Sequence, residues 1–171
     1  MNVGHAILYD DGELVISKNH TLLQKRIIKD YGEFDDRNVP WKKELDQIKK
    51  VQILEQVKVN YLKSWFEYCI NLKTLINFQN LDTSVCTDFS CMFACCESLQ
   101  TLTELENWNV SNGTDFSCMF SCCKLLQKIS LSNTLDILSK NIFLNCNLNL
   151  KIKWKNHTYT YSDLLEYEQI S

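Results

Sequence analysis

The sequence predicts an α/β solenoid, with one array of short repeats and a cap at each end. Three observations predict this: two segments are nearly identical, apolar residues recur in columns at the same spacing, and both flanks alternate like hairpins. A chain of 171 residues is about one domain with a modest core. Four glycines and one proline exclude collagen-like, linker-rich and strongly disordered chains.

The repeat is the strongest signal. Residues 82–96 read DTSVCTDFSCMFACC and residues 109–123 read NVSNGTDFSCMFSCC, with ten of fifteen positions identical at an offset of 27. A fainter copy ends at Phe143 and Cys146. The same offset of 27 relates Leu75, Leu102 and Ile129, Phe66, Phe93 and Phe120, and Cys69, Cys96 and Cys123. One such unit cannot bury its apolar faces alone, so three or four units are expected to stack.

Each unit predicts a short helix followed by a short strand. Thr87 and Thr114 are good N-caps, and the acids that follow them suit a helix N-terminus. Apolar residues then fall at the i, i+3, i+4, i+7 spacing of one helix face: Phe89, Met92, Phe93 and Cys96 in the first copy, and Phe116, Met119, Phe120 and Cys123 in the second. The series Leu99, Leu102, Leu105, Trp108 has apolar residues every three positions. That spacing fits a short strand entered and left by turns.

The segments LDTSVCTDFSCMFACCESLQTL and NWNVSNGTDFSCMFSCCKLLQKI resemble the BspA-like leucine-rich repeat over roughly residues 65–130. The sequence departs from that pattern at Cys86 and Gly113, which replace a valine, and at cysteines added in variable positions. The resemblance implies a curved solenoid of leucine-rich-repeat type, with parallel strands on one side and short helices on the other. It also implies recognition of proteins or surfaces, often by secreted proteins, and rarely catalysis.

Both flanks are interpreted as caps. Residues 1–60 form the N-terminal cap, 61–147 the repeats, and 148–171 the C-terminal hairpin and helix. In the first cap, a hairpin turns at Asp11-Gly12. A helical turn over 22–30, a loop over 31–40, a short helix over 41–49 and a strand over 50–59 follow. Asn60 is expected to cap a helix over 61–69. In the second cap, a hairpin turns at Asn156-His157, and Ser162 caps a terminal helix.

Nine cysteines raise the question of whether the protein lies in a reducing or an oxidising compartment. No signal peptide or membrane-length apolar stretch is seen in the sequence, which favours a cytoplasmic protein with thiols as small buried hydrophobes. A surface location stays open if a leader is missing. Cys91, Cys95, Cys118 and Cys122 repeat on neighbouring units, so disulfides or a metal site at these four also stay open, beside simple packing. Fragment status and oligomeric state are left open.

Catalysis has little support, and we expect no enzyme, no cofactor and no metal ligands. The three histidines, His5, His20 and His157, lie in no nucleophile–base setting. Asp88 and Asp115 are better explained by helix-terminus electrostatics than as paired catalytic carboxylates. Four glycines make a phosphate-binding loop hard to build.

Charge indicates the kind of partner. Residues 65–123 contain seven acids and one base, a local net charge of −6 within a chain of −3. Such a region repels phosphates and steers basic protein surfaces toward it, so direct nucleic-acid or membrane binding is not expected. The predicted function is a non-catalytic protein-recognition module that binds through its acidic repeat and sheet surface. The predicted protein-binding residues are Thr74, Ile76, Thr101, Thr103, Glu104, Glu106, Lys128 and Ser130.

Three alternatives accompany this prediction. One is a small phage-type inhibitor, of the anti-defence or anti-CRISPR kind, that docks on a nucleic-acid-handling protein. Another is a fragment of a secreted or cell-surface adhesin. The third is a cysteine-based metal or redox protein.

Overall fold

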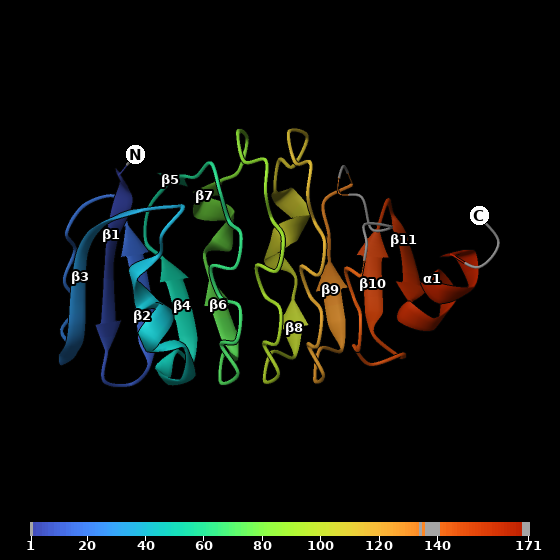
Figure 1. The fold of residues 1–171 in the computed structure, drawn as a ribbon, viewed down its shortest axis with the longest axis horizontal. Helices are drawn as coiled ribbons and strands as arrows, with labels where there is room; N and C mark the ends of the chain where they lie inside the picture. The colour runs from blue at the N-terminus through green and yellow to red at the C-terminus, as the bar shows by residue number, and fades with distance from the viewer. Residues whose placement is uncertain (1, 134, 136–140, 169–171) are drawn as a thin grey trace.

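A computed structural model describes residues 2–133, 135 and 141–168 and shows a β-solenoid whose coils stack along one axis (Figure 1). The N-terminal strands lie at one end of the stack and the C-terminal helix at the other. Each coil has two walls. The sheet wall consists of short strands. The turn wall consists of consecutive tight turns, at residues 61–69, 88–96, 115–123 and 141–146.

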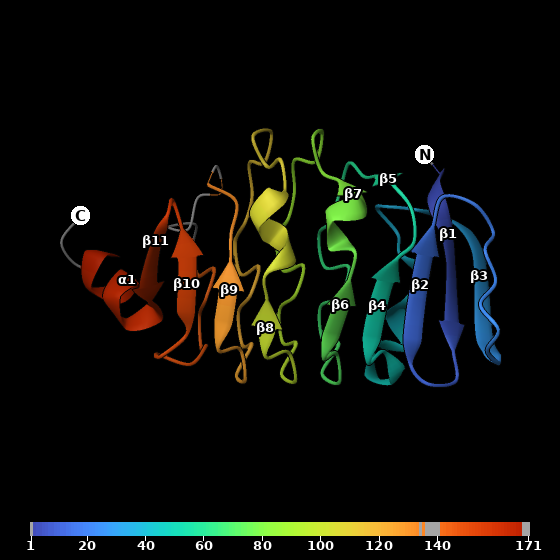
Figure 2. The same ribbon diagram turned by 180° about the vertical axis from the view of Figure 1, so that it is seen from behind.

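The sheet wall is mostly parallel. Figure 2 shows its strands side by side along one face of the molecule. In chain order they are β2 (Glu13–Ser17), β4 (Lys50–Ile53), β6 (Thr74–Ile76), β8 (Thr101–Leu102), β9 (Lys128–Ser130) and β10 (Lys151–Trp154). Strand β4 pairs in parallel with β2 and β6, and β9 pairs in parallel with β8 and β10. The predicted strands of the repeat are therefore confirmed.

The N-terminal end is closed by antiparallel strands. Strand β1 (Asn2–Tyr9) pairs antiparallel with β2 and with β3 (Ile27–Asp35). The hairpin predicted at Asp11-Gly12 is confirmed, and Gly12 adopts the positive φ of 83° that the turn requires. The helical turn predicted over 22–30 is wrong, because β3 begins within that range and pairs with β1. The loop predicted over 31–40 is wrong in its first half, because β3 continues to Asp35.

Short elements connect this end to the first coil. Two 3₁₀ helices, η1 (Pro40–Lys43) and η2 (Leu45–Gln47), replace the single helix predicted over 41–49. The strand predicted over 50–59 is interrupted, so that β4 is followed by β5 (Val57–Lys58). The remaining short elements are β7 (Leu81–Asp82), which pairs with β5, and the 3₁₀ helices η3 (Phe78–Asn80) and η4 (Glu104–Asn107).

The helices predicted on the second side of each coil are wrong. Residues 61–69, 88–96 and 115–123 form turns, and α1 is the one α-helix in the described part of the chain. Amides at alternate positions bond to the next coil: Cys91 donates to Ser117 O (3.0 Å) and Phe93 to Met119 O (2.9 Å). In a helix those amides would bond four residues back within the same segment. The turn wall is therefore a ladder between coils.

Positive backbone φ angles make this ladder regular. Two residues in each coil of the turn wall, four positions apart, have φ between 54° and 64°, which no helix tolerates. They are Ser64 and Tyr68, Cys91 and Cys95, Cys118 and Cys122, and Asn141 and Asn145. In each coil the two residues that follow the first positive-φ residue are buried, which reproduces part of the apolar spacing of a helix face without a helix.

An aromatic column runs through the core. Phe66, Phe93, Phe120 and Phe143 stack with ring centroids 5.7, 5.9 and 5.5 Å apart. Trp41 of η1 stacks on Phe66 at the N-terminal end, 6.0 Å away at an interplanar angle of 12°. Because each ring is fully or almost fully buried, the column supplies much of the apolar area that holds neighbouring coils together.

The C-terminal end, like the N-terminal end, is closed by an antiparallel hairpin. Strand β11 (His157–Thr160) pairs antiparallel with β10, and the helix α1 (Tyr161–Glu168) follows, with Tyr161 against Phe143. The predicted hairpin and helix are confirmed, although the end of the predicted helix lies outside the described residues. The cap is Thr160 rather than Ser162: Thr160 N–H donates to Asp163 Oδ2 (2.7 Å), and Asp163 N–H donates to Thr160 Oγ1 (3.2 Å).

Candidate functional site

The residues predicted to bind a partner lie along the sheet wall and its 3₁₀ turns. Thr74 is opposite Lys50 across the β4–β6 pair, Thr101 is opposite Lys128, and Lys128 is opposite Lys151. We call Lys50, Thr74, Thr101, Lys128 and Lys151 the sheet row. All except the half-buried Lys50 are exposed. Stacked strands thus present one polar side chain per coil at a fixed position.

The second predicted row is less uniform. Thr103 is exposed and Ile76 is half-buried, whereas Ser130 retains only 3% of its exposure. Ser130 lies opposite the exposed Lys153 on β10. A partner on this face would contact Thr103 and Lys153 before Ser130.

The two predicted glutamates near η4 already have partners in the fold. Glu104 Oε2 accepts a hydrogen bond of 2.7 Å from the backbone N–H of Phe78 in the preceding coil. Glu106 Oε1 lies 2.6 Å from Lys153 Nζ. Glu104 therefore stabilises the stacking of two coils, while Glu106 is an exposed ion-paired side chain at the edge of the sheet row.

Most other acids of the repeats stabilise turns. Asp88 Oδ1 accepts bonds from Ser90 N (2.9 Å) and Ser90 Oγ (2.6 Å), and Asp115 holds Ser117 in the same way. The pKa of Asp115 is lowered, first by the Ser117 hydroxyl and then by its backbone N–H. These carboxylates cap turns rather than helices, since no helix follows them. Their negative charge remains, although their hydrogen bonds are directed inward.

Eight of the nine cysteines divide into two sets, and the buried Cys86 lies outside both. Cys96, Cys123 and Cys146 are buried, and each thiol donates to a phenylalanine carbonyl of the preceding coil, at 3.2, 3.2 and 3.1 Å. Burial raises their pKa, to about 12 for Cys146. They form an interior column, continued by Cys69, that packs as the repeat spacing indicates.

The other set is half-exposed and pairs between coils. Because Cys91 N–H donates to Ser117 O and Cys95 N–H to Ser121 O, Cys91 lies beside Cys118, and Cys95 beside Cys122. Burial raises the pKa of Cys95 to about 11. Hydrogen bonds from Ser121 and Asn145 lower that of Cys122. All four cysteines have free thiols in the structure.

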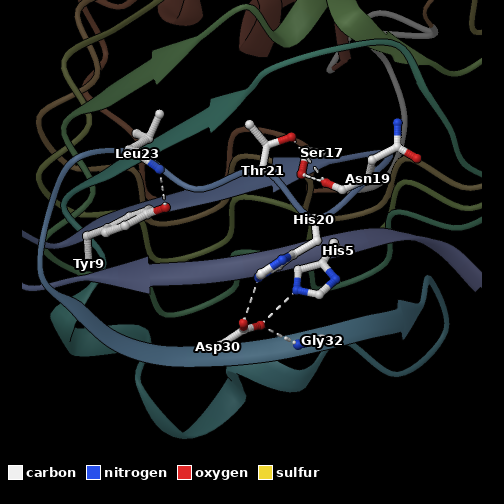
Figure 3. Close-up of polar contacts among 9 residues, drawn as sticks. All are labelled: His5, Tyr9, Ser17, Asn19, His20, Thr21, Leu23, Asp30 and Gly32. Atoms are coloured by element: carbon white, nitrogen blue, oxygen red, sulfur yellow. Dashed lines mark hydrogen bonds and ion pairs between the residues drawn. The ribbon is translucent and has the colours of Figure 1, made fainter.

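A second polar cluster, which the sequence did not indicate, lies at the N-terminal end. Figure 3 shows His5 of β1, His20 of the segment between β2 and β3, and Asp30 of β3 pointing toward one another. Asp30 Oδ1 is 2.8 Å from His5 Nε2, and Oδ2 is 2.9 Å from His20 Nε2. Asp30 also accepts a hydrogen bond from Gly32 N–H (2.9 Å). No short sequence motif predicts this cluster, because the pairing of β1 with β3 brings together positions that are 25 residues apart in the chain.

His157, the third histidine, lies apart from this cluster. It is exposed at the start of β11, and its Nδ1–H donates to the carbonyl of Lys155 at 2.8 Å, as expected for a residue at a hairpin turn. It has no carboxylate partner among the described contacts.

A shallow hollow also lies beside the first coil. It is about 390 Å³ in volume, and its lining includes Asp36, Arg37 and Tyr61. The buried Asp36 carboxylate accepts bonds from Asn60 N (2.6 Å) and Tyr61 N (3.3 Å), while the Arg37 guanidinium lies 4.4 Å from the centre of the Tyr61 ring. These groups hold the first coil against the N-terminal strands, which accounts for them without a ligand.

Among the described residues, no helix has the length and apolarity needed to cross a membrane. No curated protein and no solved structure matches the chain significantly. A family model described as "Mycoplasma protein of unknown function, DUF285" matches residues 36–154, which run from the residue after β3 to the end of β10 and leave out β1, β2 and β3. The chain therefore belongs to the DUF285 family.

Proposed function

We propose that this chain is a non-catalytic protein-recognition module of leucine-rich-repeat type that binds its partner through the sheet wall. The observation that carries the proposal is the sheet row: Thr74, Thr101, Lys128 and Lys151 are exposed at equivalent positions of successive strands. Parallel pairing of β8, β9 and β10 holds Thr101, Lys128 and Lys151 about 4.8 Å apart, so this part of the row is rigid before binding, whereas Thr74 lies on β6 in the other sheet. The family resemblance supports the same face as the recognition surface.

The net charge of the repeats indicates the surface charge of the proposed partner. The repeats carry a net charge of −6 over residues 65–123, and internal hydrogen bonds do not remove it. That field attracts a partner with a basic surface at long range. At contact the partner meets threonines and lysines of the sheet row, with Glu106 at its edge, so it must also supply acceptors for Lys128 and Lys151.

Two settings fit this function: a cytoplasmic inhibitor of a nucleic-acid-handling protein, and a surface adhesin. Both use a non-catalytic binding face, and they differ in the partner that is captured.

A matched pair of charge reversals tests the proposal. Lys128 lies in the sheet row, whereas Lys124 is exposed directly after the turn-wall segment 115–123, where it pairs with Glu97 at 2.7 Å. Proteins captured from lysate by the wild-type chain are quantified by mass spectrometry against K128E, T101R and K124E. We expect K128E and T101R to lose the same captured protein and K124E to retain it, with all variants unfolding at similar temperatures. Equal capture by all four chains, or loss with K124E alone, contradicts the sheet wall as the binding face.

A further inference from the structure

The cluster of His5, His20 and Asp30 has the composition of a metal site. Two imidazole nitrogens and one carboxylate oxygen, each from a different segment, lie within 4.8 Å of one another. The two rings are close, with centroids 4.4 Å apart. Both present Nε2 to the same carboxylate, as the close-up in Figure 3 shows. Three donors therefore converge on one small volume at the surface of β1 and β3.

We propose that His5, His20 and Asp30 bind a divalent transition-metal ion of the zinc type. Imidazole and carboxylate together suit Zn²⁺, and also Co²⁺ and Ni²⁺. Donors about 2.0–2.1 Å from a tetrahedral ion lie ~3.3 Å from one another. The two nitrogen–oxygen distances, 2.8 Å to Oδ1 and 2.9 Å to Oδ2, are shorter than that separation, so an ion between the donors requires them to move outward and the carboxylate to turn one oxygen toward the ion.

The donors are held in place by the fold. His5 lies on the central strand of three, between Ser17 of β2 and Glu33 of β3, and its side chain is only 13% exposed. The Gly32 N–H bond fixes the carboxylate of Asp30. This backbone contact resembles the outer-sphere hydrogen bonds that orient ligands in metal sites.

The segment that carries His20 is also anchored on both sides. Before it, Ser17 Oγ donates to Asn19 O, and Asn19 N–H donates to Glu55 (3.0 Å). After it, Leu23 N–H donates to the Tyr9 hydroxyl (2.9 Å). Figure 3 shows the Ser17 and Tyr9 bonds on the two sides of His20. A metal ion would therefore join an irregular segment to β1 and β3 with little further ordering.

Metal binding must displace the Nε2 protons of the two histidines. In the metal-free cluster each Nε2–H donates to Asp30, whereas a metal ion needs the lone pair of each Nε2. On binding, a neutral ring shifts its proton from Nε2 to Nδ1, whereas a doubly protonated ring keeps Nδ1–H and releases the Nε2 proton to solvent, and Asp30 exchanges two hydrogen bonds for one metal bond. Three protein donors leave a fourth position for water or for a donor from a partner.

Titration with Zn²⁺ and Co²⁺ tests the site. The purified full chain is titrated by calorimetry with Zn²⁺, and with Co²⁺ by visible absorption, which distinguishes nitrogen and oxygen ligands from thiolates. We expect one ion per chain and a rise in unfolding temperature with metal. H20A and D30N should weaken binding at least tenfold. His20 is half-exposed, so its loss should leave the metal-free fold intact.

Two controls give the result its meaning. H157A removes a histidine outside the cluster, and the double variant C95S/C122S removes one of the two half-exposed thiol pairs. Both should bind metal like the wild type. The proposal is overturned by absence of binding to the wild-type chain, by unchanged affinity in H20A and D30N, or by loss of binding in C95S/C122S. None of these results depends on the protein-recognition proposal.

Discussion

The two walls of each coil bury similar side chains with different backbones. On the sheet wall, two- to four-residue strands between coils pair in parallel with extended φ and ψ, and alternate side chains point inward. On the turn wall, residues with positive φ interrupt the chain every fourth position, and alternate amides still bond to the next coil. The spacing of apolar residues therefore shows which side chains point inward. It does not by itself show whether the backbone that carries them is a helix, a strand or a series of turns.

Thiol labelling tests which cysteine side chains of the turn wall point inward and which point outward, and the difference in labelling rate is the largest effect that we expect. Cys96 is buried and its pKa is raised by burial, whereas Cys122 is half-exposed with a pKa lowered by Ser121 and Asn145. Because thiolate is the reactive form, Cys122 should react with iodoacetamide at lower pH than Cys95, whose pKa is raised to about 11.

Cys96 reacts only after opening, so its labelling should be at least ~1,000-fold slower than that of Cys122. Peptide mapping over time between pH 7 and 9 measures both rates, and labelling in urea provides the unfolded reference. Equal rates at Cys96 and Cys122 in the folded chain would contradict the assignment of inward and outward positions.

Truncation of the aromatic column compares the contribution of the two walls to the core. F93A removes a fully buried ring that stacks on Phe66 and Phe120, so we expect a loss of about 3–5 kcal/mol in the free energy of unfolding. T101A on the exposed side of the sheet wall should change it by less than about 0.5 kcal/mol. Urea unfolding measures both, and a similar small change for the two variants would show that the rings do not form a continuous core.

Substitution by a β-branched residue distinguishes the two backbones directly. Cys118 has a φ of 56°, so C118V should destabilise the chain by about 1–3 kcal/mol through backbone strain. C118N is the matched control, because asparagine tolerates this conformation, and T101V places valine in a strand that favours it. If C118V and T101V have equal stability, the positive φ angles of the turn wall are incorrect.

Loss of one turn-capping carboxylate has the smallest expected effect. D115A removes the acceptor for Ser117 N–H and Oγ, and should cost about 1 kcal/mol at pH 7. The pKa of Asp115 is lowered in the fold, so its contribution is present above the unfolded carboxyl pKa and declines as pH falls through the folded value.

The stability difference between wild type and D115A should therefore shrink below about pH 4. Unfolding by urea at pH 7 and pH 3 measures it. D115N keeps an acceptor oxygen but no charge, so it should retain only part of the Asp115 contribution at pH 7, and that part should not change with pH. A difference that grows on acidification would be inconsistent with the hydrogen-bonded carboxylate.

The array and its ends follow from local signals in the sequence. The offset of 27 placed Phe93 above Phe66 and Cys123 above Cys96, because stacked coils align equivalent residues. Asp11-Gly12 marked the first hairpin, since an Asp-Gly pair between apolar runs favours such a turn. These features depend on short stretches of chain or on identity between repeats, which a sequence displays directly.

The turn wall and the histidine cluster depend on contacts that no local pattern displays. Cys91 and Cys95 take positive φ because the next coil supplies acceptors, and cysteine has no intrinsic preference for that conformation. His20 reaches Asp30 only because β3 folds back along β1. The spacing of apolar residues therefore predicted helices where hydrogen bonds between coils form the turn wall. The motifs of the sequence missed the histidine cluster, because strand pairing brings its residues together.

Alternate amides of the turn wall bond to carbonyls of the next coil, and this pattern distinguishes the turn wall from a helix. Scalar coupling across hydrogen bonds, measured by NMR on isotopically labelled protein, detects which carbonyl each amide contacts. The structure predicts a coupling between Phe93 N–H and the carbonyl of Met119, which are joined by a bond of 2.9 Å. A coupling from Phe93 N–H to the carbonyl of Phe89 would instead show a helix in this segment and contradict the account.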